Sequence, residues 1–312
     1  MFTFACPRCH TALEQAAADL MVCPVDRLTF QRVDGVWRML LPERLETFQK
    51  FIQDYETVRL AEGRGLPSAA YYQALPDRDL SQRMAADWHI RAASFTVFLK
   101  SVLGPFEQVA GRPLRILDLG AGNGWLSNRL AARSHQVAAV DLTTNDYDGL
   151  GCYRYYETKF VPVQAEFDHL PFLDRFADMV LFNASLHYST GYEKTLQESF
   201  RVLDQAGRLV ILDTPFYLDE TSGEKMVQER QIQFSQKFGF PSNALDSENY
   251  LTYQRLEDLV TKLNLSCQIL TPCYGIGWAL RPWKARLFGR REPAKFHLVV
   301  FQANSMNVPE LR

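Results

Sequence analysis

Three glycines alternate with other residues in the segment ILDLGAGNGW, residues 116–125. They are Gly120, Gly122 and Gly124, and they follow a short apolar run that is typical of a buried strand. Glycine has no Cβ and adopts positive φ readily, so such a loop lets a ligand approach the backbone closely. The start of the helix that follows favours a negatively charged group. We therefore expect a ligand to bind at the end of this strand.

A second acidic position strengthens this expectation. Asp141 lies in the apolar stretch AAVDL, about 20 residues after the loop, where a carboxylate can accept hydrogen bonds from both hydroxyls of a ribose. The dinucleotide-binding pattern G-x-G-x-x-G would place a glycine at residue 125, but this residue is Trp125. The spacing is instead G-x-G-x-G, preceded by Asp118, which argues against a pyrophosphate ligand.

Five motifs follow one another in order: ILDLGAGNG, AVDL, AEFDHLPF, ADMVLFNASLHY and FRVLDQAGRLVILD. The series resembles that of the class I S-adenosylmethionine-dependent methyltransferases, over residues 110–215. The resemblance implies S-adenosylmethionine as cofactor and S-adenosylhomocysteine as product. The alternative is an α/β domain that binds another nucleotide.

The resemblance also implies a role for each matching position. Asp118 and the loop backbone would hold the methionine part of the cofactor; the loop residues are Gly120, Ala121, Gly122, Asn123 and Gly124. Asp141 would hold the ribose and Leu142 would pack on the adenine. Glu166, where the family often has an aspartate, would accept the adenine amino group, and Phe167 would offer its N–H to the ring. Asn183 would lie beside the methionine part.

Methyl transfer from a sulfonium is an in-line displacement, so alignment and a water-free site supply much of the rate. His187, in NASLHY, is the candidate base, because a neutral imidazole can take a proton near pH 7. The alternative is a hydrogen-bonded histidine of the loop or core. Arg91, in DWHIRAAS, could pair with the carboxylate of the cofactor, or form a surface ion pair.

The N-terminal cysteines suggest a metal site. Cys6 and Cys9 form one CxxC pair, whereas Cys23 is followed three residues later by Asp26. Two such hairpins make a tetrahedral zinc site of three sulfurs and one carboxylate oxygen. The first forty residues resemble small zinc-ribbon segments that also precede some rRNA guanine methyltransferases. Two alternatives stay open: a ribbon that holds zinc, and a packed hairpin without metal.

The surrounding elements follow from hydrophobic periodicity. Helical spacing predicts helices over 45–55 and 84–103, the second ended by Gly104 and Pro105. From residue 114 on, apolar strands alternate with helices, which is typical of a parallel sheet covered on both faces. One of these helices, over 192–203, should end with Gly207 as its C-cap. We predict a Rossmann-like α/β fold with a seven-stranded, mostly parallel sheet. The expected domains are a zinc-ribbon-like segment (1–42), a helical linker with cofactor-covering helices (43–110) and a methyltransferase domain (111–312) with a helical insertion near 220–250.

The bulk composition sets limits on partners. The 312 residues are 47% hydrophobic and 22% charged, with a formal net charge of −2, so no global basic field draws the protein to nucleic acid or anionic lipid. The start has no signal-peptide pattern, and no apolar run approaches the roughly 20 residues of a membrane span. We expect a cytoplasmic protein without membrane association. One local basic cluster is either a solvated face or a site for an anion or RNA phosphate: Arg281, Lys284, Arg286, Arg290 and Arg291.

The preferred function is methyl transfer to a small-molecule acceptor. The alternatives are an rRNA or tRNA methyltransferase, in which the ribbon and the basic cluster contact RNA, and a non-catalytic partner protein that keeps the fold. RNA binding would depend steeply on salt, whereas methyl transfer to a small molecule would not. Titration with the cofactor tests the non-catalytic alternative.

Overall fold

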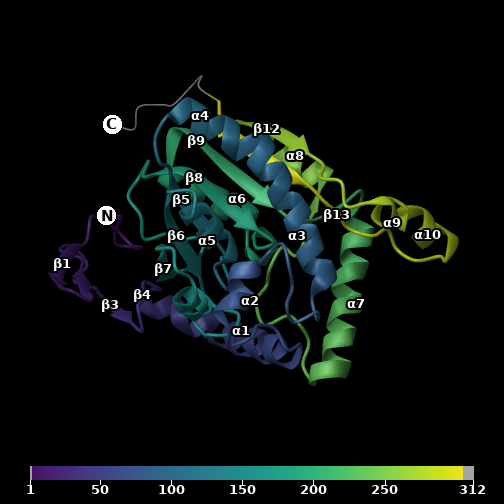
Figure 1. Ribbon diagram of the computed structural model, residues 1–312, viewed down its shortest axis with the longest axis horizontal. Helices are drawn as coiled ribbons and strands as arrows, with labels where there is room; N and C mark the ends of the chain where they lie inside the picture. The colour runs from purple at the N-terminus through teal and green to yellow at the C-terminus, as the bar shows by residue number, and fades with distance from the viewer. Residues whose placement is uncertain (1, 305–312) are drawn as a thin grey trace.

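A mostly parallel sheet forms the centre of the fold (Figure 1). The computed structural model describes residues 2–304. Seven strands lie in the order β7-β6-β5-β8-β9-β14-β12. Their bounds are β5 (Arg115–Leu119), β6 (Gln136–Asp141), β7 (Val161–Gln164), β8 (Ala177–Asn183), β9 (Leu203–Leu212), β12 (Leu265–Leu270) and β14 (Leu298–Ala303). The first five of these strands, β7, β6, β5, β8 and β9, are parallel to one another, whereas β14 is antiparallel to both β9 and β12. The predicted fold class is therefore confirmed.

The strand order reverses in the middle of the sheet. β6 and β7 follow β5 on one side, whereas β8 and β9 lie on its other side. In open α/β sheets, ligands bind beyond the carboxyl ends of the strands at such a switch point. The glycine loop, residues 120–124, leaves β5 here and leads into α5 (Trp125–Ala131).

Helices cover both faces of the sheet (Figure 1). On one face, Leu117 of β5 shares an apolar core with residues of α6 (Tyr192–Val202) and α8 (Tyr253–Lys262). On the other face, Ile116 shares a core with residues of α3 (Ala85–Phe98) and α5. Successive side chains of a strand point to opposite faces, so these two neighbours serve two different cores.

The helix predicted over 84–103 does not end at Gly104 and Pro105, so that expectation is wrong. α3 continues through a π-helical turn over Leu99–Leu103 into α4 (Gly104–Ala110). In this turn Gly104 N–H donates to the carbonyl of Leu99, five residues earlier. Proline lacks an N–H and its ring collides with a carbonyl in a regular helix, and the wider turn accommodates it without ending the helix.

Gly207 is not a helix C-cap, so this expectation is also wrong. α6 ends at Val202, and the chain enters β9 at once. Gly207 lies within β9, at an irregularity in its pairing with β8. Its backbone packs there against Leu203: a Cβ added at Gly207 would lie 2.7 Å from the Leu203 side chain. The glycine is therefore explained by this close approach rather than by the end of the helix.

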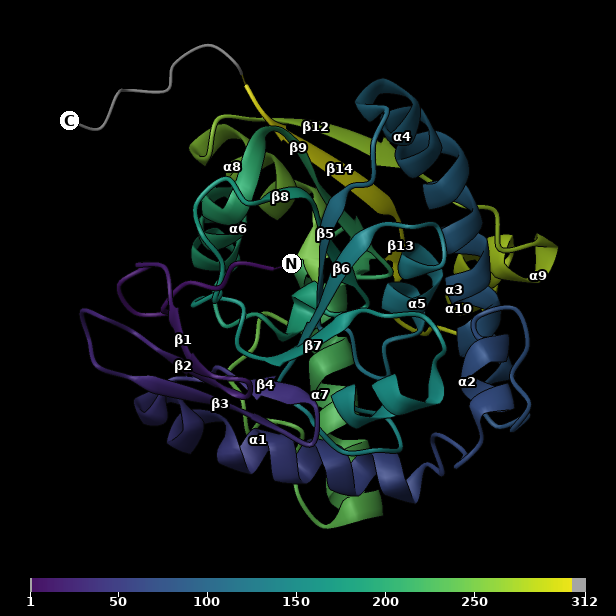
Figure 2. The same cartoon turned by 60° about the vertical axis from the view of Figure 1, so that its left-hand side comes forward.

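The N-terminal residues extend the central sheet (Figure 2). They form four short antiparallel strands: β1 (Glu14–Ala17), β2 (Leu20–Val22), β3 (Thr29–Val33) and β4 (Val36–Arg38). β4 pairs in parallel with β7, with Trp37 opposite Val163. Next come α1 (Pro42–Ala61), which spans the helix predicted over 45–55, and α2 (Ala69–Ala74).

The segment after β9 forms the predicted helical insertion. α7 (Glu220–Phe238) is its long helix, and an irregular segment returns the chain to residue 250. A small sheet frames it, made of β10 (Pro215–Tyr217), β11 (Leu251–Thr252) and β13 (Lys295–Phe296). Further on, α9 (Ile276–Ala279) and α10 (Arg281–Leu287) project from the body (Figure 1). Within residues 2–304, no helix combines the length and the apolar character needed to cross a bilayer.

Candidate active site

The glycine loop adopts backbone conformations that other residues rarely reach. Gly120, Gly122 and Gly124 have φ values of 75°, 54° and 79°. The N–H groups of Gly120 and Ala121 both donate to the carbonyl of Val140, at 2.7 and 3.0 Å, which ties the loop to the end of β6. A Cβ added at Gly120 would lie 2.3 Å from the Cβ of Ser185. Glycine is therefore required at residue 120 for space as well as for backbone conformation.

Asp141, at the end of β6, contacts the backbone of the glycine loop. Its Oδ2 accepts a hydrogen bond from Gly122 N–H at 2.8 Å. Its Oδ1 accepts two from Thr143, from the backbone N–H at 2.8 Å and from the hydroxyl at 2.7 Å. Burial raises the pKa of the Asp141 carboxyl above its ordinary value, although these bonds oppose the shift. A carboxylate has about four acceptor positions, so one stays available toward the adjoining cavity.

This cavity, which we call the loop cavity, has a volume of about 80 Å³. Six of the predicted site residues line it, so the structure brings them together: Gly120, Gly122, Asp141, Leu142, Glu166 and Phe167. Three aromatic side chains of α1 close its other side: Phe48, Phe51 and Tyr55. α1 therefore lies over the carboxyl ends of the strands.

Glu166 also lines the loop cavity, but its carboxylate is already engaged. Arg44 of α1 binds it with two parallel hydrogen bonds, at 2.7 and 2.8 Å, and His169 Nδ1 lies 2.9 Å from its Oε1. Burial opposes ionisation, but the bonds from His169 and Arg44 hold the pKa of Glu166 below its ordinary value. Glu166 thus holds the start of α1 against the sheet and keeps about one acceptor position for a ligand.

Five of the predicted cofactor-binding residues line neither the loop cavity nor the larger one beside it: Asp118, Ala121, Asn123, Gly124 and Asn183. Asp118 is fully buried behind the loop, where its Oδ2 accepts a hydrogen bond from Ser127 at 2.7 Å. Its Oδ1 has no partner among the described residues. Burial raises the pKa of the Asp118 carboxyl to about 7. Asn183 ends β8, paired with Leu212. Asp118 therefore acts on the loop through α5, which begins at the loop and carries Ser127.

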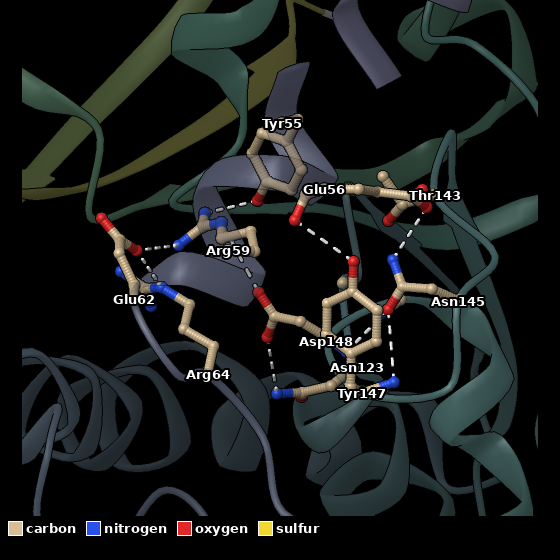
Figure 3. Close-up of polar contacts among 12 residues, drawn as sticks. Tyr55, Glu56, Arg59, Glu62, Arg64, Asn123, Thr143, Asn145, Tyr147 and Asp148 are labelled. Atoms are coloured by element: carbon tan, nitrogen blue, oxygen red, sulfur yellow. Dashed lines mark hydrogen bonds and ion pairs between the residues drawn. The ribbon is translucent and has the colours of Figure 1, made fainter. Parts of the chain in front are cut away.

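A polar network that sequence reasoning missed joins α1 to the glycine loop (Figure 3). Asn123 Nδ2 lies 3.5 Å from Asp148 Oδ1, and Arg59 Nε lies 3.5 Å from Asp148 Oδ2. Arg59 also donates to the hydroxyl of Tyr55, one turn earlier on the helix. Asp148 belongs to the irregular segment after β6, so nothing in the periodicity of the sequence marked it. The network fixes the end of α1 relative to the loop.

The segment that carries Asp148 is itself ordered by one side chain (Figure 3). Asn145 Oδ1 accepts hydrogen bonds from the N–H groups of Tyr147, Asp148 and Gly149, at 2.8–3.2 Å. Its Nδ2 donates to Glu56 of α1 at 2.9 Å. An asparagine that binds the backbone in this way nucleates a tight turn, so this turn holds Asp148 toward Arg59.

A second, larger cavity adjoins the first. Its volume is about 290 Å³, and we call it the arginine cavity because four arginines line it. They are Arg59, Arg64, Arg91 and Arg230. The two cavities share lining residues, among them Phe51, Tyr55 and Tyr188, so these aromatic side chains separate one cavity from the other. Neither Arg59, Arg64 nor Arg230 was predicted from the sequence.

The predicted residues His187 and Arg91 both line the arginine cavity. His187 lies in a single helical turn, Leu186–Tyr188, which follows β8, and its ring packs on Tyr188 at 4.4 Å. Its Nδ1 is buried without a partner among the described residues. Burial, helped by nearby Arg230, lowers its pKa to about 3. The guanidinium of Arg91 stacks on Trp88 at 4.7 Å from the ring centre.

The predicted metal ligands Cys6, Cys9, Cys23 and Asp26 come together near the N-terminus, with ligand atoms all within 4.8 Å of one another. Cys9 Sγ and Cys23 Sγ are 3.5 Å apart, and Cys6 Sγ is 3.2 Å from Asp26 Oδ2. Tetrahedral zinc with Zn–S bonds of about 2.3 Å sets two sulfurs roughly 3.8 Å apart. The spacing of the four side chains therefore fits such an ion.

The two halves of this cluster have the same backbone conformation. In the first, His10 N–H donates to the carbonyl of Cys6, and His10 has a φ of 59°. In the second, Arg27 N–H donates to the carbonyl of Cys23, and Arg27 has a φ of 60°. Asp26 therefore occupies the position in the second turn that Cys9 occupies in the first.

The basic cluster near the C-terminus does not join either cavity as a group. Arg281 lines neither the loop cavity nor the arginine cavity, and Trp283, Leu287 and Phe288 between its members are exposed. Arg291 instead bonds to Glu229 at 2.6 Å, on α7.

Comparison with known proteins agrees with this geometry. Residues 117–211 match the family model described as Methyltransferase domain. The chain carries a methyltransferase domain. This domain begins in β5 and ends in β9, so it contains the glycine loop, Asp141, Glu166 and His187.

Individual relatives are similar to parts of the chain. The malonyl-[acyl-carrier protein] O-methyltransferase of Geobacter sulfurreducens is 34% identical over 42% of this chain and 49% of its own length. The ubiquinone/menaquinone biosynthesis C-methyltransferase of Vibrio cholerae is 33% identical over 32% of this chain and 40% of its own length. The chain thus spans half or less of these relatives. A solved 1,6-didemethyltoxoflavin-N1-methyltransferase of Burkholderia thailandensis, with S-adenosylhomocysteine bound, superposes over 94% of this chain and 99% of its own, with a TM-score of 0.46 and 16% identity.

Proposed function

We propose that this protein transfers a methyl group from S-adenosylmethionine to a small-molecule acceptor. One observation carries the proposal: two adjoining cavities at the switch point of a methyltransferase domain share the aromatic residues that separate them. The loop cavity suits the nucleoside, since it combines a glycine-lined wall, a carboxylate and aromatic side chains. The arginine cavity is then the place for the acceptor.

Each predicted residue takes a role that fits its position. Asp141 accepts a hydrogen bond from the ribose on its remaining acceptor position, and Leu142 and Phe167 contact the adenine. The loop backbone approaches the methionine part, with Asp118 supporting the loop through Ser127. Asn183 lies beside the methionine part. Arg91 pairs with the carboxylate of the cofactor. Glu166 receives the adenine amino group on the acceptor position that Arg44 and His169 leave available.

The sulfonium of the bound cofactor supplies an activated methyl group. The chain contributes alignment and exclusion of water, which are large terms in such a displacement. Phe51, Tyr55 and Tyr188 stand between the two cavities, so they surround the path along which the methyl group must travel. His187 faces this region from the acceptor side.

Two measurements test the proposal. Isothermal titration of the full chain with S-adenosylhomocysteine should show binding to one site, and no binding would refute the cofactor assignment. Incubation of a metabolite extract with the protein and isotope-labelled S-adenosylmethionine, followed by mass spectrometry, should yield a labelled small molecule. A label found only in RNA, in reactions that slow steeply with salt, would favour the RNA alternative.

We also propose that the N-terminal cluster binds zinc through Cys6, Cys9, Cys23 and Asp26, with a structural role. The matched backbone turns and the separations of the ligand atoms support this. None of the six cysteines, all of which lie in the described part of the chain, forms a disulfide, which fits a reducing compartment such as the cytoplasm. Metal analysis of the purified protein tests the assignment: about one zinc per chain is expected, and a metal-free protein with unchanged thermal stability would contradict it.

A further inference from the structure

The arginine cavity carries an excess of positive charge. Four arginines line it, but only two acidic residues do, Asp54 and Glu62. Arg59 and Arg64 also have carboxylate partners outside the lining, Asp148 and Asp87, each at 3.5 Å, so the unbalanced positive charge belongs to the other two arginines. Asp54 pairs with Lys50 at 2.7 Å, outside the lining. Glu62 pairs with Arg64 at 2.7 Å and lies 3.9 Å from Arg59. Both carboxylates that line the cavity are therefore already paired with basic side chains.

Arg91 and Arg230 have no carboxylate within 4 Å among residues 2–304. Arg230, on α7, donates to Ser242 Oγ at 3.0 Å and to Asn249 Oδ1, both neutral oxygens. Arg91 stacks on Trp88. The acidic residues that act electrostatically on its guanidinium are Asp213 and Asp87. Burial lowers the pKa of both guanidinium groups, which means that their charge is poorly solvated. A half-buried cation without an anion is unfavourable unless a ligand supplies the counter-charge.

The imidazole of His187 lies in the field of these cations. Arg230, Arg59 and Arg91 all act against its protonation, together with burial. His187 is therefore neutral at physiological pH. Its buried, unpartnered Nδ1 can donate or accept one hydrogen bond with a ligand, depending on the tautomer. A group this hard to protonate is a weak base, so it is poorly suited to removing a proton from an alcohol.

The remaining lining is apolar or aromatic, apart from Ser242, Ser247 and Asn249. Phe234 and Phe240 come from the insertion, and Phe51 and Tyr188 from the wall shared with the loop cavity. A ligand that fits this cavity therefore combines a planar or apolar body with a negative charge.

We propose that the methyl acceptor is an organic anion with an apolar body, whose charge is held by Arg230. The proposal rests on the proposed function, since it describes the second substrate of the same site. Arg91 and Arg230 then have separate tasks, one toward the carboxylate of the cofactor and the other toward the acceptor. An acceptor that arrives ionised needs no protein base: its lone pair forms the bond to the methyl carbon, the carbon–sulfur bond breaks, and the electron pair stays on the sulfur.

The test compares charged and neutral ligands of the same shape. The full chain, saturated with S-adenosylhomocysteine, is titrated with matched aryl carboxylates and their primary amides, from benzoate and benzamide to the biphenyl pair. We expect the carboxylates to bind at least about tenfold more tightly, as for a partly desolvated charged hydrogen bond. Arg230→Gln should remove this preference and leave the affinity for S-adenosylhomocysteine unchanged. Arg230→Lys should retain part of it.

Lys225→Gln is the matched control, because it removes one exposed positive charge from the same helix, and it should retain the full preference. Equal binding of the two ligand sets, absence of binding by both, or a preference that survives Arg230→Gln would overturn the proposal. These outcomes differ from a failure of the proposed function, in which S-adenosylhomocysteine itself does not bind to the unsubstituted chain.

Discussion

The backbone N–H of Gly122 donates a hydrogen bond to Asp141 Oδ2 across 2.8 Å. The bond joins the loop after β5 to the carboxyl end of β6, so one carboxylate both shapes the loop and faces the loop cavity. The loop and the ribose-binding position are therefore a single structural unit. Substitutions on either side of this bond should affect both loop conformation and cofactor binding.

Asp141→Ala should weaken the binding of S-adenosylhomocysteine by roughly 1.5–3 kcal/mol, the range for losing hydrogen bonds to a charged group. This corresponds to about 10- to 150-fold in the dissociation constant, measured by isothermal titration. Asp141→Asn keeps one acceptor oxygen and should lose less. Unchanged affinity in the alanine variant, in a protein with wild-type circular dichroism, would discard the ribose assignment.

Gly120→Ala should destabilise the fold more than Gly111→Ala does. Both residues have positive φ, which costs alanine about 1–2 kcal/mol. A Cβ at Gly111 meets nothing within 4 Å, whereas one at Gly120 collides with Ser185. Overpacking adds about 1–3 kcal/mol. Urea denaturation of the two variants isolates this second contribution, and equal losses would show that the loop shifts freely away from Ser185.

The stability of the protein should fall in acid partly because of His187. Its folded pKa of about 3 lies below the ordinary value of 6.5, so the unfolded chain binds the proton more readily. The stabilisation is complete above pH 6.5 and is lost as the pH falls from there toward 3. In urea titrations between pH 8 and pH 5, His187→Gln should lose less stability than the unsubstituted protein. His89→Gln, an exposed position on α3, serves as the control and should follow the unsubstituted protein.

Asp26→Cys should tighten zinc binding, because it completes a set of four sulfurs at a position equivalent to Cys9. Competition with a chromophoric chelator measures the affinity, and the thermal midpoint should become more resistant to chelation than in the unsubstituted protein. Cys9→Ser, which removes a ligand from the matching position, should weaken binding instead. If the two variants bind zinc alike, Asp26 is not a ligand.

The central sheet and the glycine loop could be predicted because their signals are local. Apolar runs such as RILDL and QVAAVD mark buried strands, and the alternating glycines fix the turn between β5 and α5. The arginine cavity could not be predicted in the same way. Arg59 comes from α1 and Arg230 from α7, and only tertiary packing brings them to His187.

Other differences have equally specific causes. The bidentate pair of Arg44 with Glu166 joins residues 122 positions apart, which no periodicity reports. The wrong helix end at Gly104 and Pro105 arose because a π-helical turn is invisible to rules for regular helices. Gly207 resembles a C-cap in the sequence, but close packing against Leu203 explains it.

The pairing of β4 with β7 has a practical consequence for anyone who wishes to produce the methyltransferase domain alone. A fragment that starts after residue 42 would leave the hydrogen-bonding groups of β7 uncovered, beside the fully buried Val163. Unprotected strands of this kind recruit other chains and lead to aggregation. Strands β1 to β4 therefore belong in any expressed fragment, because they cover the β7 edge of the central sheet.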